Sequence, residues 1–234
     1  MYDSLTLWQP IEEIKDSGYY SRVPTLLNNV GEHINENGEI YITGHLKNFR
    51  IYLSERGISV KGSLNKFYHE DNFNKLTRQQ TELSFEKLND SLKIDFSNST
   101  LRRIDLAHNF IMTNEVESYY NFLGDSQYYK RLTQPNSIYY RNEQRTKLFY
   151  NKVLEGKKKG IEIPEIWTSK NVLRYELRFM NRIAKQLNMT RVIAKDLYQE
   201  AFYIDLIDRW IQEYFLIRKN KLLTPKIGNM TSKG

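Results

Sequence analysis

The chain has 234 residues, 40% of them hydrophobic and 27% charged, so it can form a sizeable core in one large or two small domains. Lys and Arg number 35 against 28 Asp and Glu, and the net charge of +7 favours a polyanionic partner. The absence of cysteine excludes disulfides and thiolate sites, and the absence of a signal sequence or a long apolar run predicts a cytoplasmic protein without a membrane span.

The first third of the chain is predicted to consist mainly of strands. Residues 1–36 show little periodicity. The segment 38–68 alternates between apolar and polar residues and contains turn residues, which predicts two or three antiparallel strands. Thr77 with Gln80 forms a capping box and begins a helix predicted over 77–93.

Strands and helices alternate in the rest of the chain. We predict a strand over 101–112, a short helix capped by Asn114 with Glu117, a hairpin of 137–140 with 146–155, a basic turn over 156–160, a strand over 171–180, and a helix from 190 to about 219. Seven apolar residues at 3–4 spacing predict the buried stripe of this helix: Ile193, Leu197, Ala201, Ile204, Ile207, Ile211 and Phe215.

This order of elements predicts an α+β fold. Its mostly antiparallel sheet would carry helices on one face and a long C-terminal helix, as in RRM-like proteins. The other face would be free to bind a ligand. We divide the chain into an N-terminal segment packed on the core (1–36), a central domain (37–185) and a C-terminal helix and tail (186–234).

Strand alternation places charged residues and a tyrosine on one face of the predicted sheet. If the strands pair, that face carries two carboxylates, several cations and a phenol. Such a set is typical of metal-assisted attack on a phosphodiester. The residues are Arg103 and Asp105 in one strand, Arg174, Glu176 and Arg178 in another, and Tyr150 with Lys152 in a third.

Four segments also stand in the order of a known protein family. They are GSLNKFYHEDN at 62–72, RRID at 102–105, SIYYRNEQRTKLFYNKVLE at 137–155 and LRYELR at 173–178. Through them the chain resembles the filamentous-phage and plasmid replication initiators of the gene II/X type, which are rolling-circle endonucleases. The resemblance covers roughly 40–180. It implies an HUH-like nuclease sheet, with 37–185 as the endonuclease domain.

The resemblance implies a reaction and its partners. A tyrosine would nick one strand of origin DNA, keep the 5′ end as a phosphotyrosine, leave a 3′-OH primer and later rejoin the strand. The DNA would be single-stranded or supercoiled, and a host helicase and polymerase would follow in the bacterial cytoplasm. The family motifs assign the nucleophile to Tyr150 and further roles to Glu155, Arg103, Asp105, Arg174 and Glu176. The family often has Gly at the position of Glu70, and an acidic residue at that of Asn151.

The chemistry also requires a cation near the phenol. The pKa of a tyrosine is about 10, so a base or cation must assist its attack, and we assign this role to Lys152. The chain lacks a His-apolar-His pair, so Mg²⁺ or Mn²⁺ would be held by Asp105 and Glu176, with Glu155 as a third ligand. Arg103 and Arg174 would offset charge on the phosphorane. DNA binding is predicted for Lys61, Lys66, Arg145, Lys147, Lys157, Lys158, Lys159 and Arg178.

Other interpretations stay open at this point. Tyr139 or Tyr140 could replace Tyr150 as nucleophile, and the carboxylates could form structural ion pairs. His45 could join the metal site, whereas His108 should face the core. Competing functions are a non-catalytic repressor or RNA-binding protein, a plasmid mobilisation relaxase, and a structural or interaction protein.

Overall fold

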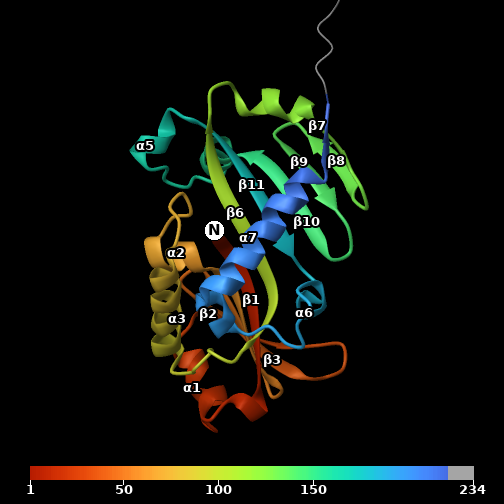
Figure 1. Cartoon of the computed structure of the whole chain (residues 1–234). Coiled ribbons are helices and arrows are strands. Elements are labelled where there is room, and N and C mark those ends of the chain that lie inside the picture. Colours follow the sequence, from red (N-terminus) through yellow and green to blue (C-terminus); the bar gives the residue numbers. More distant parts are fainter. Residues whose placement is uncertain (221–234) are drawn as a thin grey trace, which may run out of the picture.

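A ten-stranded antiparallel sheet forms the centre of the computed structural model, which describes residues 1–220 (Figure 1). Its strand order is β2-β3-β4-β5-β1-β6-β11-β10-β9-β8. These strands are β1 (Tyr2–Pro10), β2 (Asn28–Ile34), β3 (Ile40–Leu46), β4 (Phe49–Ser54), β5 (Gly57–Ser63), β6 (Thr100–Met112), β8 (Lys130–Gln134), β9 (Ser137–Arg141), β10 (Arg145–Asn151) and β11 (Asn171–Phe179). A separate pair consists of β7 (Leu123–Ser126) and β12 (Ile217–Lys219).

Helices stand between the strands, which confirms the predicted α+β class. The α-helices are α1 (Tyr19–Thr25), α2 (Leu64–His69), α3 (Arg78–Leu92), α4 (Lys152–Lys158), α5 (Glu165–Thr168), α6 (Ile183–Gln186) and α7 (Glu200–Phe215). Three 3-10 turns are η1 (Ile11–Glu13), η2 (Val116–Phe122) and η3 (Ala194–Tyr198). None of the helices within residues 1–220 has the length and apolar character needed to cross a bilayer.

The core lies between the sheet and the helices α3 and α7, and α7 runs across the sheet in Figure 1. Strand alternation turns Ile104, Leu106 and Leu177 to this side, where they are fully buried. The ring of Tyr175 lies between those of Phe149 and Trp210, at 4.5 Å from each. We call this the helix-covered face of the sheet, and the other the open face.

A small second cluster covers one end of the open face. Phe73, Val153 and Val172 are buried there, with Ile163 and Trp167 packed against them. The cluster joins the segment after α2, the start of α4 and the first residues of β11. It therefore closes one side of the open face and leaves the rest accessible.

The strand β1 at the centre of the sheet was not predicted. It pairs with β5 on one side and β6 on the other, with Leu5 opposite Gly62 and Ile104. Leu5 and Leu7 are buried in the core, whereas Thr6 and Trp8 lie on the open face. The alternation is short and interrupted by two register shifts, so periodicity alone gives a weak signal.

Two predicted strands end earlier than expected because a side chain caps a helix. The strand predicted over 146–155 stops at Asn151, whose Oδ1 accepts a hydrogen bond from the Leu154 backbone N–H at 3.0 Å. Lys152 and most of the predicted basic turn therefore belong to α4. In the same way, Ser63 ends β5 and caps α2.

The predicted C-terminal helix is divided into three elements, and its main helix buries a different side from the predicted one. Residues 190–219 form η3, α7 and β12, and the buried side of α7 carries Leu206, Trp210 and Glu213. The predicted stripe is wrong in its second half, because Ile204 is 51% exposed and Phe215 is 74% exposed. The short helix after β6 is confirmed as a 3-10 turn, but Asn114 does not cap it. The predicted tail beyond residue 220 lies outside the described residues.

Candidate active site

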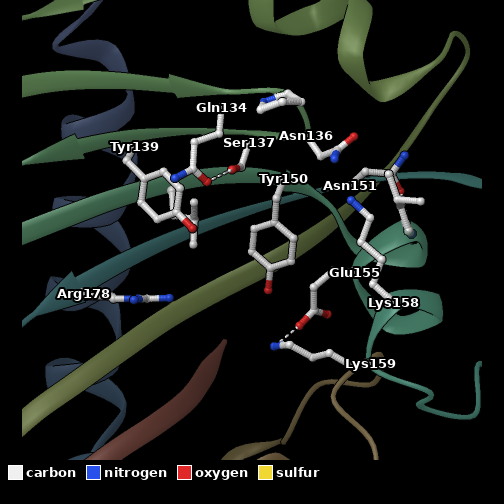
Figure 2. Close-up of a pocket in the computed structure, with 13 residues that line it drawn as sticks. Gln134, Asn136, Ser137, Tyr139, Tyr150, Asn151, Glu155, Lys158, Lys159 and Arg178 are labelled. Carbon is white, nitrogen blue, oxygen red and sulfur yellow. Dashed lines mark hydrogen bonds and ion pairs between the residues drawn. The ribbon is translucent and has the colours of Figure 1, made fainter.

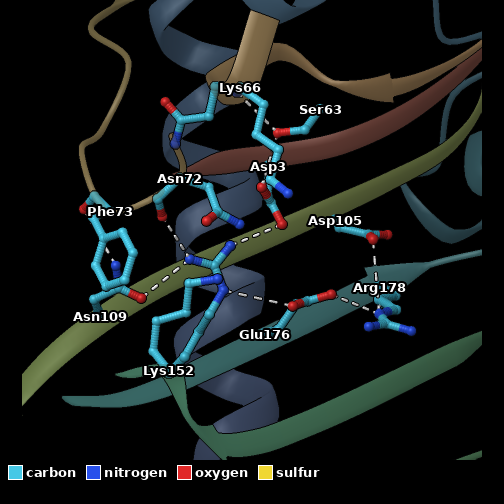
Figure 3. A network of polar contacts seen from close by, with 12 residues as sticks. Asp3, Ser63, Lys66, Asn72, Phe73, Asp105, Asn109, Lys152, Glu176 and Arg178 are labelled. Carbon is cyan, nitrogen blue, oxygen red and sulfur yellow. Dashed lines mark hydrogen bonds and ion pairs between the residues drawn. The ribbon is translucent and has the colours of Figure 1, made fainter. Parts of the chain in front are cut away.

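Five charged side chains alternate in sign across the open face (Figure 3). Asp3 Oδ2 lies 2.8 Å from Arg174 Nη2, and Arg174 Nε lies 3.6 Å from Glu176 Oε2. Arg178 Nε lies 2.6 Å from Glu176 Oε1 and 3.7 Å from Asp105 Oδ2. Arg174, Glu176, Asp105 and Asp3 are all more than nine-tenths buried. This row of charges forms the centre of the candidate site.

The register of the sheet explains why these residues meet. Arg178 stands opposite Asp105 in the β11–β6 pair, and Tyr150 stands opposite Arg174 in the β10–β11 pair. Paired residues of neighbouring strands share a face. At the end of the row, Arg103 binds Asp105 through both carboxylate oxygens, at 2.8 and 2.6 Å. The structure therefore brings together the residues that strand alternation placed on one face.

Asp3 is a member of the cluster that sequence reasoning missed. Ser63 donates a hydrogen bond to Asp3 Oδ1 at 3.1 Å. Burial opposes ionisation of Asp3, but the charges of Arg174 and Lys152 outweigh it and hold the pKa of Asp3 below its usual value. Its role depends on β1 lying beside β6, which no local pattern near residue 3 indicates.

Arg174 is the buried centre of the row. Its guanidinium donates hydrogen bonds to the Asn72 backbone oxygen and to Asn109 Oδ1, each at 3.1 Å. Burial alone would lower the pKa of Arg174, but Asp3, Tyr150 and Glu176 raise it above the usual value. Arg174 is therefore a permanent cation that fixes the two carboxylates on either side of it.

The half-buried phenol of Tyr150 opens into two adjoining cavities of about 350 and 340 Å³. In Figure 2 its hydroxyl points into the space bounded by Arg178, Glu155 and Lys159. Burial raises the pKa of Tyr150 well above its usual value, although Arg174 acts in the opposite direction. The phenol is thus neutral at physiological pH and faces a cavity lined by several charged residues.

Lys152 approaches Tyr150 from α4 and not from the same strand. Its Nζ lies 2.9 Å from Glu155 Oε2 and 6.0 Å from the centroid of the Tyr150 ring. Burial, and then Arg174, lower the pKa of Lys152. Burial opposes ionisation of Glu155, but hydrogen bonds from Lys159 and Lys152 hold the pKa of Glu155 below its usual value. These three residues form an ion-paired group at the mouth of the site.

This geometry coincides with a family match. A family model described as the N-terminal part of a replication-associated protein, the gene 2 protein, matches residues 1–201. The chain belongs to this family. The resemblance to gene II type replication initiators is therefore confirmed, and the protein is a phage-type replication initiator that acts on DNA. A search of curated proteins found no matching relative.

The residue Glu70, which stands where the family often has Gly, has an unusual backbone conformation. The backbone of Glu70 has a φ of 68°, in the left-handed region that favours glycine. This residue ends α2, just before Asn72 and Phe73 approach Arg174 and Asn109. The loop thus adopts the shape that a glycine would favour, although the chain has a glutamate there.

Only two of the three predicted metal ligands lie close together in this protein. Within residues 1–220, no three His, Asp or Glu side chains are grouped so that they could hold a metal ion together. Glu155 is held by Lys152 and Lys159, and His45 lies on β3, beyond β1, β5 and β4. Asp105 and Glu176 remain as a pair of hard oxygen donors that share Arg178. Such a pair suits Mg²⁺, which often binds one or two carboxylates and otherwise water and phosphate.

The predicted DNA-binding residues divide between the two faces. Lys66, Lys158, Lys159 and Arg178 line the cavities at Tyr150, Lys61 lies further along the open face, and Lys157 is exposed on α4. Arg145 and Lys147 lie on the helix-covered face, because they alternate with Tyr150 in β10. Lys147 is fully buried, with Nζ 2.8 Å from Glu213 Oε2, and Arg145 pairs with the same carboxylate. We therefore leave these two out of the DNA-binding set.

The alternative tyrosines and His108 are also placed by alternation. Tyr139 lines the same cavity as Tyr150. Tyr140 is buried on the other side, where its hydroxyl donates a hydrogen bond to the Gly124 oxygen at 2.7 Å. His108 faces the helix-covered side, with its ring 4.6 Å from that of Phe110. Of the three tyrosines, Tyr139 and Tyr150 are the ones that face the cavity.

Asp105 carries an unfavourable charge. Burial is the main cause, and with Glu176 it raises the pKa of Asp105 to about 6 despite the hydrogen bonds from Arg103. The folded protein therefore binds a proton at Asp105 more readily than the unfolded chain does between about pH 4 and 6. Asp105 thus lowers the stability of the protein as the pH rises through this window.

We expect Asp105→Asn to raise the free energy of unfolding at pH 7.5 by about 1–3 kcal/mol, because each pKa unit corresponds to about 1.4 kcal/mol. At pH 4 the gain should vanish. Urea denaturation at both pH values measures the difference. Asp205→Asn, in a surface ion pair with Arg209, is the control and should change stability little. A loss of stability at pH 7.5 would show that the pairs of Asp105 with the arginines outweigh its burial.

Proposed function

We propose that this replication initiator nicks and rejoins one strand of origin DNA through a 5′-phosphotyrosine at Tyr150. The observation that carries the proposal is the position of the phenol. Tyr150 opens into a cavity lined by Arg178, Lys159 and Glu155, opposite the buried Arg174. A phosphodiester in this cavity would meet a nucleophile and several cations at once.

Each group in the cavity has a role in the proposed step. The Tyr150 oxygen forms a bond to phosphorus while the bond from phosphorus to the 3′ oxygen breaks. The phenol must lose its proton, and the Glu155 carboxylate is placed to accept it. Lys159 and Arg178 offset the charge of the phosphorane, and the proton returns to the leaving 3′ oxygen. Lys152 is buried against Glu155 and positions it.

The metal is the second part of the proposal. Asp105 and Glu176 would hold Mg²⁺ or Mn²⁺, which when bound polarises the phosphoryl oxygens. Arg103 and Arg178 hold the two carboxylates side by side, and Arg174 fixes Glu176 from the other side. This role accounts for the burial of Asp105 at a cost in stability, since a divalent cation would offset the two negative charges.

An adduct assay tests the proposed function. The protein is incubated with Mn²⁺ and supercoiled DNA from its own replicon, and denaturing gels are used to detect protein joined to a 5′ end. We expect a covalent adduct and a free 3′-OH that a polymerase extends, and both should be absent when EDTA is added. Tight DNA binding without an adduct would contradict the proposal and favour a non-catalytic repressor.

A further inference from the structure

The open face continues beyond the site over β1, β5, β4 and β3, and it carries a row of polar residues that contains the cations Arg103, Lys61 and Arg50. Each residue of the row stands directly opposite the next in the neighbouring strand. At about 4.8 Å per strand the row extends for roughly 19 Å. From the site outwards it consists of Arg103, Thr6, Lys61, Arg50 and His45.

Two cations of this row, Arg50 and Lys61, are available for a ligand. Arg50, Lys61 and His45 are exposed, and within residues 1–220 Arg50 and Lys61 form no ion pair. From Ser4 to Trp8 in β1, and at the open-face positions of β3, β4 and β5, the described chain has no Asp or Glu. Within the described residues Arg50 and Lys61 therefore carry positive charge that no neighbouring carboxylate compensates, and this charge attracts a polyanion.

A stack of aromatic rings lies beside the row on the same face. The ring of Tyr41 lies 5.0 Å from His33 and 4.9 Å from Tyr52, at interplanar angles of 23° and 29°. Trp8 lies on the same face under the guanidinium of Arg102, at 4.5 Å. These rings are partly exposed rather than buried in the core. Aromatic rings beside cations bind the bases and phosphates of a single strand.

The row is continuous with the catalytic cavity. A hollow of about 280 Å³ over Arg50 and Lys61 shares Ser4, Asn48 and Arg103 with the cavity that contains Asp105 and Tyr150. A strand that leaves the cavity on this side therefore passes directly onto the row. The opposite exit is closed by the cluster of Phe73, Val153 and Val172.

We propose that the open face of β1, β5, β4 and β3 binds the single-stranded DNA that extends from the scissile phosphate. Lys61 and Arg50 contact its phosphates, and Tyr52 and Tyr41 stack on its bases. The span corresponds to a few nucleotides. This inference rests on the proposed function, because it takes the strand in the cavity as its starting point.

Fluorescence anisotropy with 5′-labelled dT20 and with a 20-base-pair duplex tests the proposal. We expect Arg50→Gln with Lys61→Gln to weaken binding of dT20 about tenfold, and to reduce the slope of log K against log salt by about 1.4, as for two single-strand phosphate contacts. Tyr41→Leu with Tyr52→Leu should weaken the binding of dT20 by roughly tenfold or more and leave the affinity for the duplex unchanged. Thermal melting verifies that each variant is folded.

The matched control has the same loss of charge on the other side of the molecule. Lys185→Gln with Lys195→Gln removes two exposed lysines from α6 and η3, in the helical layer. Equal losses in this control and in the Arg50 and Lys61 variant would overturn the proposal, because charge alone would then explain binding. If the Arg50 and Lys61 variant lost affinity for the duplex but not for dT20, the proposal would also be overturned. The adduct assay is separate, so a failure of the nicking chemistry would leave this result readable.

Discussion

Tyr150→Phe is expected to abolish the covalent adduct and to lower the nicking rate by on the order of 10⁴-fold or more. The substitution removes the oxygen that would attack phosphorus and leaves the ring in place. The Tyr150 hydroxyl forms no hydrogen bond with described residues, so the fold should be unaffected. The measurement is single-turnover nicking of supercoiled DNA with Mn²⁺, together with thermal melting and DNA affinity.

Tyr139→Phe is the control for this prediction. Tyr139 lines the same cavity from β9 and carries the same phenol, one strand away from Tyr150. Its substitution should leave the adduct intact. If the adduct persists in Tyr150→Phe and disappears in Tyr139→Phe, the nucleophile is Tyr139. If it persists in both, neither phenol in the cavity is the nucleophile.

Arg174→Met is expected to have the largest effect on stability, a loss of about 3–5 kcal/mol at pH 7.5. Arg174 is 2% exposed and pairs with Asp3 and Glu176, which are also buried. Without the guanidinium these two carboxylates would be left without their shared cation. Urea denaturation measures the loss, and Arg191→Met is the control. Arg191 lies at the surface, where it pairs with Glu13 and donates hydrogen bonds to Thr100 and to the Asn98 oxygen, so its removal leaves no buried carboxylate without a cation and should cost clearly less, about 1–2 kcal/mol.

The pH dependence separates this effect from a simple loss of packing. In the native protein Arg174 helps to hold the pKa of Asp3 below its usual value. The ionised Asp3 therefore stabilises the fold at a pH above the usual pKa of an aspartate, and this stabilisation is lost as the pH falls. In the variant the buried Asp3 would favour its protonated form, and stability should increase as the pH falls. The difference between the two proteins should therefore narrow from pH 7.5 to pH 4. A difference that stays constant would show that packing, not charge, is lost.

Local patterns predicted the strands that carry the site, because each face of these strands is chemically uniform. Over 103–106 in β6 and 173–179 in β11 hydrophobic and charged residues alternate, so alternation assigns Asp105, Glu176 and Arg174 to one face correctly. The same rule, applied to β10, would have placed Lys147 on the face opposite to that of Tyr150. A positive charge alone does not show that a lysine is exposed, because Glu213 compensates the charge of Lys147 inside the protein.

Features that depend on contacts between distant segments could not be predicted. Asp3 joins the site only because β1 inserts between β5 and β6. The cap that turns Lys152 onto a helix is local, since Asn151 Oδ1 accepts from the Leu154 N–H, but the alternating pattern of 146–155 hides it. For α7, apolar residues surround much of the helix, and the packing of Trp210 against Tyr175 selects one side. The spacing of apolar residues does not predict which side of α7 packs against the sheet.

The central position of β1 has a consequence for the time course of folding. Its partners are β5 and β6, so the second edge of β1 finds its partner only after residue 112 has been made. At about 5–20 residues per second this delay is roughly 5–20 seconds on the ribosome. Leu5 and Leu7 are core residues of β1. They lack both neighbouring strands until β5 has been made, and one of these strands from then until β6 is complete. Long-range pairing of this kind slows folding, and the nascent chain exposes an aggregation-prone strand until β6 arrives.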